Sequence, residues 1–202
     1  VNILSQFVHR PGPEHVAAAN RVLRYLKKSP GQGLFFPKSG DLELVAYCYA
    51  DWAGCQTTRR STTGYYIQLG GAPVSWRTKK QKVVSRSSAE AEYRAMASTV
   101  SEVLWLRFLL EELGVRQQGS MPLYCDNQAA LHIAANPVFH ERTKHVEMDC
   151  YFVREQVASK EIEPKKIGTA AQQADIFTKA LGNEQFHTLL SKLGVRDLHT
   201  PT

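Results

Sequence analysis

Four carboxylates occupy positions where a strand is expected to end or a helix to begin. Asp51 and Asp126 each follow a run of residues with the composition of a buried strand. Glu92 lies in the early turns of the longest helical pattern, and Asp175 opens the last helical region. Side chains in such positions can meet at one edge of a sheet, where they repel one another unless divalent cations neutralise them. Two cations about 4 Å apart would support in-line displacement at phosphorus.

Each of these carboxylates also has a structural interpretation. An Asp after a strand is most often a turn residue, and Asp126 and Asp175 could equally be helix caps. Glu90 completes a capping box over residues 87–90, so it already has a role at the start of the long helix. Glu92 lies one turn further in and is not needed for capping. We therefore select Glu92 as the candidate ligand from this helix.

A basic segment without acidic residues precedes the same helix. Its cations are Arg77, Lys79, Lys80, Lys82 and Arg86. An extended segment of this charge suits a phosphate backbone, but lysines also protect an exposed edge strand from aggregation. A second basic loop contains Arg142, Lys144 and His145. We expect Trp76 and Trp105 to pack in the core or at a hinge and not to stack on bases.

Hydrophobic periodicity predicts the elements that position these residues. Helices are expected over residues 13–28, 87–113, 127–135, 146–159 and 174–193, the last with a break near Gly182. Strands are expected over residues 44–49, 64–69, 73–76, 121–125 and 161–167, with a hairpin turn at Gly70-Gly71. The predicted buried stripe of the long helix is Tyr93, Met96, Val100, Leu104 and Phe108. This order predicts an α/β fold with a mixed sheet.

The composition is that of a globular chain. It has 202 residues, 43% of them apolar and 22% charged, and a net charge of +6 that favours a polyanionic partner. No apolar run is long enough to predict a membrane span. The four cysteines contain no C-x-x-C pair, which argues against a zinc site and indicates reduced thiols in an intracellular compartment, cytoplasmic or nuclear. Because the first residue is Val1, we expect a fragment of a longer chain.

Seven motifs follow one another along the sequence: Tyr49–Gly54, Arg60–Tyr65, Val74–Gln81, Ser87–Tyr93, Tyr124–Ala130, His140–His145 and Ala174–Lys179. In this order they resemble the ribonuclease H domain of copia-type LTR retrotransposon polyproteins. The resemblance covers about residues 44–193. Residues 21–27 resemble the helix that ends the preceding reverse transcriptase region. We therefore expect a helical segment from that region at residues 1–40 and a ribonuclease H-like domain at residues 41–202.

The resemblance implies a ribonuclease H-like fold with a five-stranded mixed sheet and helices on both faces. It implies binding of RNA/DNA hybrids and cleavage of the RNA strand with two Mg²⁺ or Mn²⁺ ions. Glu92, Asp126 and Asp175 match three of the four carboxylates that hold those ions. Short polar side chains beside the site could reach the 2′-hydroxyls in the minor groove of a hybrid. These are Ser87, Ser88, Asn127 and Gln128.

The fourth carboxylate departs from the family pattern. The first strand of the family usually ends in Asp-Ala-Asp-Trp, and the first Asp is the residue that bridges the metals. Here that position is Tyr49, and Asp51 matches the second Asp. The two side chains share a face of the strand, but their Cα atoms are about 6.6 Å apart. A bulge near Ala53-Gly54 would be needed for Asp51 to compensate, and loss of a shared ligand costs several decades of rate.

Three functions are therefore open. The first is a hybrid-binding domain that cleaves RNA through Asp51, Glu92, Asp126 and Asp175. The second is a nuclease-dead module that binds nucleic acid or protein, recruited by a host. The third is a structural segment of a decayed polyprotein. We expect the reverse transcriptase region of the same polyprotein to be a partner, no membrane contact, and a place in virus-like particles if the element is active.

Overall fold

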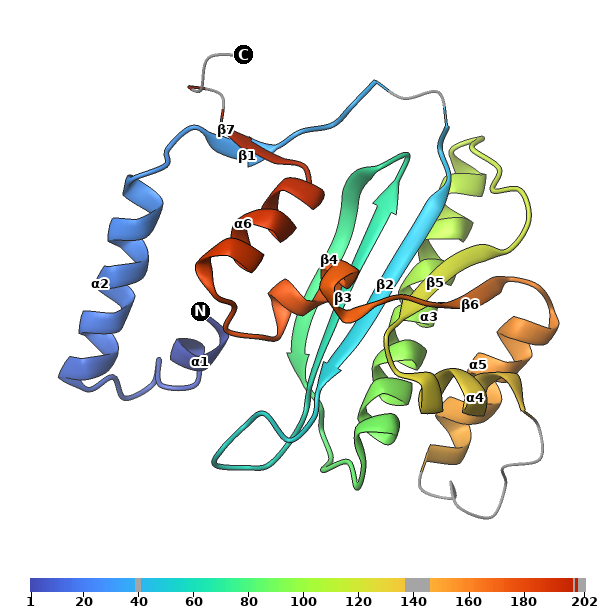
Figure 1. The fold of residues 1–202 in the computed structure, drawn as a ribbon, viewed down its shortest axis with the longest axis horizontal. Coiled ribbons are helices and arrows are strands. Elements are labelled where there is room, and N and C mark those ends of the chain that lie inside the picture. Colours follow the sequence, from blue (N-terminus) through green and yellow to red (C-terminus); the bar gives the residue numbers. More distant parts are fainter. Residues whose placement is uncertain (39–40, 137–145, 198, 200–202) are drawn as a thin grey trace.

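The computed structural model describes residues 1–38, 41–136, 146–197 and 199. Its centre is a five-stranded sheet in the order β4-β3-β2-β5-β6 (Figure 1). The strands are β2 (Leu44–Asp51), β3 (Thr62–Leu69), β4 (Ala72–Lys80), β5 (Met121–Cys125) and β6 (Ile162–Lys166). Strands β2 to β4 form an antiparallel meander, and β5 and β6 run parallel to β2. This confirms the predicted mixed sheet.

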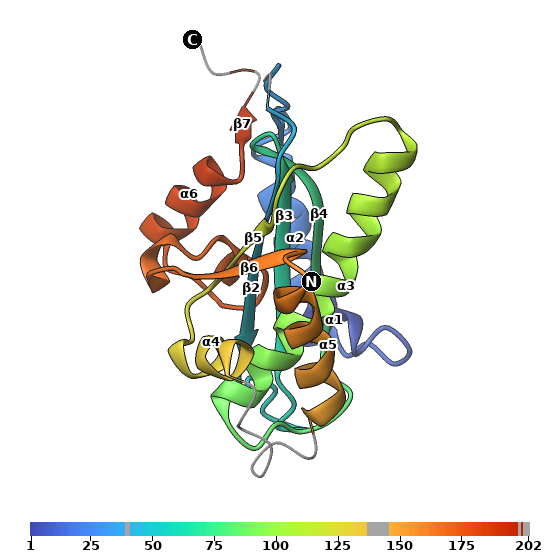
Figure 2. The same ribbon diagram turned by 90° about the vertical axis from the view of Figure 1, so that its right-hand side faces the viewer.

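Helices cover both faces of the sheet, as the resemblance implied. One face carries α3 (Ser88–Glu112) with α5 (Glu147–Ala158) packed beside it, and the other carries the 3-10 helix η3 (Gln173–Phe177) and α6 (Asn183–Lys192) (Figure 2). The short helices α4 (Gln128–Ala135) and η2 (Thr169–Ala171) follow β5 and β6. The final helical region therefore begins as a 3-10 helix, not an α-helix, and resumes after Gly182.

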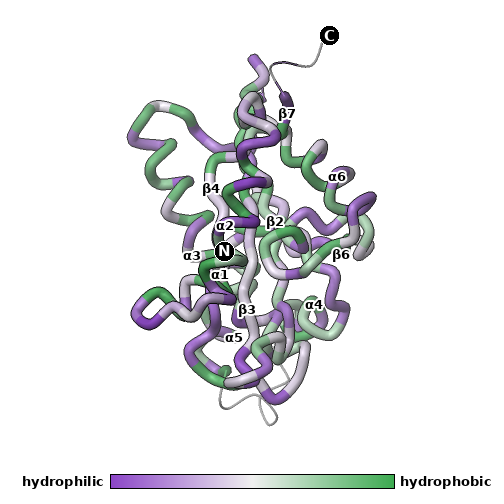
Figure 3. Tube along the Cα trace, turned by 90° about the vertical axis from the view of Figure 1, so that its left-hand side faces the viewer, coloured by the Kyte–Doolittle hydropathy of each residue, from purple (hydrophilic) through white to green (hydrophobic). Residues whose placement is uncertain are grey.

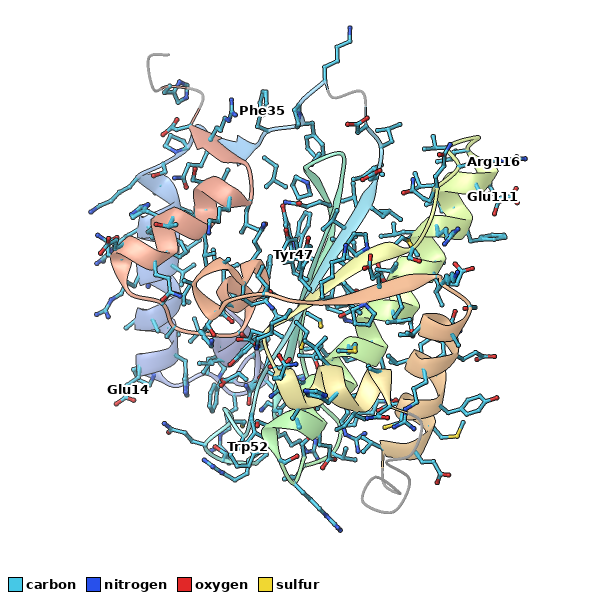
Figure 4. The ribbon with its side chains drawn as sticks, turned by 45° about the vertical axis from the view of Figure 1, so that its right-hand side comes forward. Glu14, Phe35, Tyr47, Trp52, Glu111 and Arg116 are labelled. Carbon is cyan, nitrogen blue, oxygen red and sulfur yellow. The ribbon has the colours of Figure 1, made fainter. Side chains whose placement is uncertain are left out.

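Strand β2 is buried on both faces because its side chains alternate between two cores. Leu44, Ala46 and Cys48 belong to the main core with α3, whereas Val45, Tyr47 and Tyr49 face the smaller core beneath η3. Figure 4 shows Tyr47 beside the middle of the sheet. The same alternation places Tyr49 and Asp51 on the face that η3 covers. The pleat of β2 therefore decides which site residues can meet.

The long helix α3 has the predicted ends but not the whole predicted stripe. Ser87 is its N-cap, and Gly114, with φ of +81°, follows its end. Its buried apolar residues continue from Val100 through Val103, Leu106 and Leu110, while Phe108 is 63% exposed. Leu104 is half-buried and packs against the main core, but the prediction of Phe108 was wrong because repeated steps of four residues drift around a helix of 3.6 residues per turn.

The three tryptophans lie at the surface. Trp52, at the end of β2 (Figure 4), is 47% exposed, and Trp76 and Trp105 are 51% and 56% exposed. Of the two expected places for Trp76 and Trp105, the core was wrong, because Trp76 lies on the edge strand β4 and Trp105 is exposed on α3, and a place at a hinge stays a prediction. The hairpin turn is confirmed: Gly70 and Gly71 both have positive φ.

The N-terminal segment forms α1 (Asn2–Ser5), α2 (Pro13–Lys27) and β1 (Gln32–Leu34). Strand β1 pairs antiparallel with β7 (Val195–Asp197), a two-stranded sheet that the sequence did not predict. Helix α2 has no fully buried residue and carries both hydrophobic and hydrophilic positions along its trace (Figure 3). The division of the chain into a reverse transcriptase segment at residues 1–40 and a ribonuclease H-like domain at residues 41–202 stays a prediction. No helix in the described ranges is long and apolar enough to cross a membrane.

Candidate metal centre and nucleic-acid interface

Glu92 and Asp126 meet at the end of β5, together with a residue that the sequence did not suggest. One ligand atom each of Glu92, Cys125 and Asp126 lies within 4.8 Å of the others. Cys125 is the last residue of β5, and Asp126 follows it. Asp126 is not the cap of α4, because Asn127 takes that role by accepting a hydrogen bond from the N–H of Ala130. The one hydrogen bond that the Asp126 carboxylate accepts among the described residues comes from the Thr169 hydroxyl, at 3.3 Å to Oδ2, and this neutral donor leaves the charge of the carboxylate open to a cation.

Glu92 is almost fully buried and has a structural role as well. Its Oε1 accepts a hydrogen bond from the N–H of Ala50 at 3.0 Å, which corrects the expectation that Glu92 has no structural function. Burial, and next the nearby Cys125 thiol, raise the pKa of Glu92 to about 9, against the opposing effect of the Ala50 N–H. A carboxyl group in this state holds its proton at neutral pH unless a cation takes the place of that proton.

Asp175 is fully buried in η3 and is not its cap, since Gln172 accepts the capping hydrogen bond from Ala174. Its Oδ2 forms an ion pair with Nζ of Lys179 at 2.8 Å. Its Oδ1 has no hydrogen-bond partner in the part of the chain that the structure describes. Burial raises the pKa of Asp175, while Lys179 acts in the opposite direction. Asp175 is thus compensated by a lysine through one oxygen only.

Tyr49 and Lys179 form a second contact at the same place. The Lys179 ammonium lies 4.1 Å from the centroid of the Tyr49 ring, within range for a cation–π interaction. Burial raises the pKa of the Tyr49 phenol, with Lys179 opposing this shift. The position where the family has its first Asp therefore holds an aromatic ring that supports a cation.

Asp51 ends β2, two residues after Tyr49. Burial raises the pKa of its carboxyl group and Lys179 opposes this shift, while the Asp51 charge in turn contributes to the raised pKa of Asp175. The pairing of β2 with β3 runs without a shift from Leu44 to Asp51 and ends there, whereas the bulge was expected further on, near Ala53-Gly54, where Ala53 has a φ of +52°. The Asp51 side chain turns back over the following turn: a Cβ added at Gly54 would lie only 1.9 Å from its Oδ2. Asp51 is also not a member of the cluster formed by Glu92, Cys125 and Asp126.

The donors present suit one divalent cation better than two. Glu92, Cys125 and Asp126 supply two carboxylates and a thiol within reach of one ion. A second ion would need Asp175 and a donor at position 49, but Asp175 is paired with Lys179 and position 49 is an aromatic residue. The two-ion arrangement that the family resemblance implied does not fit these residues.

The basic segment lies where the sequence predicted, on the edge strand β4 and the loop to α3. A surface groove of about 400 Å³ contains Lys79, Lys80 and Lys82, with α3 forming its other side. Lys79 and Lys82 are exposed, as are Arg77 and Arg86. Lys80 instead directs its ammonium to Cys55 and Gln6. Arg142, Lys144 and His145 lie outside the described residues.

The buried side chain of Gln81 holds the basic loop in place. Its Nε2 donates to Oγ1 of Thr63 at 3.1 Å and to the carbonyl of Ala91 at 2.9 Å, and its Oε1 accepts from Ser85. These bonds join β3, the loop and the first turn of α3. Lys79 and Lys82, on either side of this clamp, are therefore presented by a fixed backbone.

The polar residues expected beside the site lie at helix starts. Ser87 and Asn127 cap α3 and α4 through their side-chain oxygens. Ser88 and Gln128 are exposed in the first turns of these helices, and Nε2 of Gln128 lies 3.2 Å from Nε2 of His132. All four therefore lie at the starts of the two helices that carry Glu92 or follow Asp126.

Sequence reasoning missed Cys125, Lys179 and Gln81. Lys179 follows Asp175 by four residues, a spacing that signals a helical ion pair and could have been noticed. Cys125 could not have been found from cysteine spacing, because its partners come from other elements. The bonds of Gln81 depend on the tertiary structure and leave no signal in the sequence.

No family model matches this chain. The chain is 48% identical over 195 residues to the Retrovirus-related Pol polyprotein from transposon RE1 of Arabidopsis thaliana, a match that covers 96% of this chain and 13% of that protein. It is 37% identical over 195 residues to the Pol polyprotein from transposon TNT 1-94 of Nicotiana tabacum, covering 96% of this chain and 14% of that one. The chain thus spans about one seventh of these relatives or less.

A solved structure of LC11-RNase H1 in complex with an RNA/DNA hybrid matches 73% of this chain and 99% of its own. The TM-score is 0.51 at 11% identity, a likeness that shows the fold alone. Together with the order of the sheet, it establishes a ribonuclease H-like fold. The chain belongs to the copia-type retrotransposon Pol polyproteins, of which it represents the segment with this fold.

Proposed function

We propose that this domain binds RNA/DNA hybrids through the groove at Lys79 and Lys82, and that its cleavage centre is impaired by Tyr49. The observation that carries the proposal is the placement of exposed lysines on a backbone fixed by Gln81. Lysines that only protect an edge strand from aggregation can be scattered along that strand. Here the cations instead line a concave surface that leads to the start of α3, where phosphate oxygens can approach several of them.

The fold supports an RNA/DNA hybrid as the polyanion that binds to this groove. The matching LC11-RNase H1 structure was solved with an RNA/DNA hybrid, and the relatives are retrotransposon Pol polyproteins. Exposed Ser88 and Gln128 lie in the first turns of α3 and α4, the helix that carries Glu92 and the helix that follows Asp126. Short polar side chains in such positions suit the 2′-hydroxyls of a shallow minor groove.

The same geometry argues against efficient cleavage. Glu92 and Asp126 would hold one Mg²⁺ or Mn²⁺ ion with Cys125 beside it, and such an ion would supply Lewis-acid stabilisation of phosphate charge. The competing proposal is two-ion cleavage with Asp51 in place of the family's first Asp. The unbroken β2 register and the contact of Asp51 with the turn at Gly54 favour the impaired centre.

Hybrid binding is tested by the salt dependence of affinity. Fluorescence anisotropy with a labelled hybrid should give a Kd that weakens steeply with salt for the wild-type protein. The double variant K79A/K82A should weaken binding and reduce the slope of log K against log salt by roughly 1 to 2. The matched control K27A/K28A removes the same charge from the end of α2 and should leave the slope unchanged.

Equal slopes in the wild-type protein and K79A/K82A would assign these lysines to a solvated edge strand. A slope reduced equally by K27A/K28A would show that net charge, and not the groove, determines binding. In either case the proposed interface would be wrong.

We also propose the reverse transcriptase region of the polyprotein as a partner of the N-terminal helices. Helices α1 and α2 enclose an apolar groove that includes Phe7, Val16 and Leu23. Val16 and Leu23 are 49% and 58% exposed, which is a large apolar exposure for one helix. In a longer polyprotein segment, hydrogen exchange at these residues should be slower than in this chain alone.

A further inference from the structure

The buried carboxylate of Asp175 already has a counter-charge. A buried ionised carboxylate requires positive charge close by, which a metal ion or a basic side chain can supply. Here Nζ of Lys179 supplies it at 2.8 Å, through Oδ2 alone. Oδ1 is buried and has no hydrogen-bond partner among the described residues, so this side of Asp175 retains an unused capacity for a ligand.

The ring of Tyr49 lies beside the Lys179 ammonium. The ammonium is 4.1 Å from the ring centroid, and the phenol belongs to the same small core as the residues of η3. A cation beside an aromatic face and a carboxylate is held from two directions. A divalent ion at the free Oδ1 would stand next to this ammonium and be repelled by it.

We infer that Lys179, supported by Tyr49, is a built-in cation that takes the place of a divalent ion at Asp175 and keeps such an ion away. The inference rests on the proposed function, because it gives the reason for an impaired centre. Lys179 acts here as a positioning residue that sets how many divalent ions bind. A divalent ion at Glu92, Cys125 and Asp126 is compatible with it, because Lys179 pairs with Asp175, which is outside that cluster.

The test is a count of bound Mn²⁺ by electron paramagnetic resonance of the free ion, together with the rise in Tm on addition of Mn²⁺. K179M removes the charge and keeps an aliphatic stem of similar length. It should bind one more Mn²⁺ per chain than the wild-type protein and show a larger Mn²⁺-dependent rise in Tm. K179R retains the charge and should behave as the wild-type protein does.

The matched control is K165M. Lys165 forms a 2.9 Å ion pair with Glu163 on β6, but both side chains are solvent-accessible. Its removal should change neither the Mn²⁺ count nor the Mn²⁺-dependent rise in Tm. At position 49, Y49F retains the ring and should resemble the wild-type protein. Y49L removes the ring and should bind the additional Mn²⁺, at Asp175, at least several-fold more tightly than the wild-type protein does.

An equal Mn²⁺ count in the wild-type protein and K179M would overturn the inference. If K179M is unfolded in metal-free buffer, recovery of its fold on addition of Mn²⁺ supports the inference, and failure to recover overturns it. The count involves no nucleic acid. A wild-type protein that fails to bind hybrids would therefore contradict the proposed function and leave this result unaffected.

Discussion

The Oε1 atom of Glu92 accepts a hydrogen bond at 3.0 Å from the backbone N–H of Ala50, and both groups are buried. This bond ties α3 to β2 immediately after Tyr49. It makes Glu92 a structural residue of the sheet as well as a candidate cation ligand. Substitutions at Glu92 therefore have to separate these two roles.

Glu92→Gln and Glu92→Ala should differ in stability but agree in metal binding. Gln retains an acceptor for the Ala50 N–H, whereas Ala leaves that group unsatisfied at a cost of about 1–3 kcal/mol in the free energy of unfolding. Both variants should bind Mn²⁺ more weakly than the wild-type protein does. Urea denaturation and Mn²⁺ titration measure the two effects.

The pH dependence of stability should identify the same group. The pKa of Glu92 rises from its ordinary 4.5 to about 9 in the folded protein. Between these values the unfolded chain has lost a proton that the folded chain retains, so stability falls as pH rises through this window in metal-free buffer. Glu92→Gln should remove this contribution. An identical fall with pH in the wild-type protein and Glu92→Gln would contradict the assignment.

Glu90→Ala should lower stability and leave Mn²⁺ affinity unchanged. Glu90 Oε2 accepts a hydrogen bond from the N–H of Arg86 at 2.7 Å, one residue before the position expected for a capping box, and Oε1 pairs with Arg94 at 3.1 Å. We expect a loss of about 1–2 kcal/mol in the free energy of unfolding. The control Glu111→Ala, at an exposed position in the last turn of α3 (Figure 4), should change it by less than about 0.5 kcal/mol.

Cys55 should be the most reactive of the four thiols. The Lys80 ammonium, 3.0 Å from its Sγ, and then Thr58 lower the pKa of Cys55 to about 6. The thiolate therefore predominates at neutral pH, whereas Cys48, Cys125 and Cys150 are buried. Iodoacetamide should modify Cys55 first, with a rate that reaches half its maximum near pH 6. Lys80→Met should move this midpoint to higher pH, as measured by mass spectrometry of the modified cysteines. An unchanged midpoint in Lys80→Met would contradict the role of Lys80.

The parts of the fold that depend on local chemistry could be predicted from the sequence. Strand β5 was predicted with its observed bounds, and Ser87 and the Gly70-Gly71 turn were predicted from capping and turn preferences. The pairing of β1 with β7 could not be, because two strands of three residues at opposite ends of the chain have no distinctive pattern.

The candidate site also has a part that could be predicted from the sequence and a part that could not. The family motifs indicated Glu92, Asp126 and Asp175, and the departure at position 49 could be seen in the sequence. The surroundings of Tyr49 could not be seen there, because its ring contacts Lys179, a residue far along the chain, only in the folded structure. Spacing also gave no means to decide whether Asp51 compensates. The register of β2 with β3 and the direction of the Asp51 side chain bear on that question.

Tyr49→Asp should restore activity if Tyr49 is the cause of the impairment. The substitution adds a carboxylate at the family's first ligand position and removes the ring that supports Lys179. It should increase Mn²⁺ binding and raise cleavage of a hybrid with a labelled RNA strand by several decades. Tyr49→Asn is the matched control, because it removes the ring without adding a charge. It should restore little cleavage.

Asp51→Asn in the wild-type background completes the test. Because the Asp51 side chain lies against the turn at Gly54 and is not part of the cluster of Glu92, Cys125 and Asp126, its loss should change cleavage little. The opposite result is equally clear: a wild-type domain that cuts hybrids at an ordinary rate and loses this activity with Asp51→Asn would show that Asp51 has taken the metal-bridging role. Tyr49 would then be compatible with an active cleavage centre, and the proposal that this centre is impaired would be wrong.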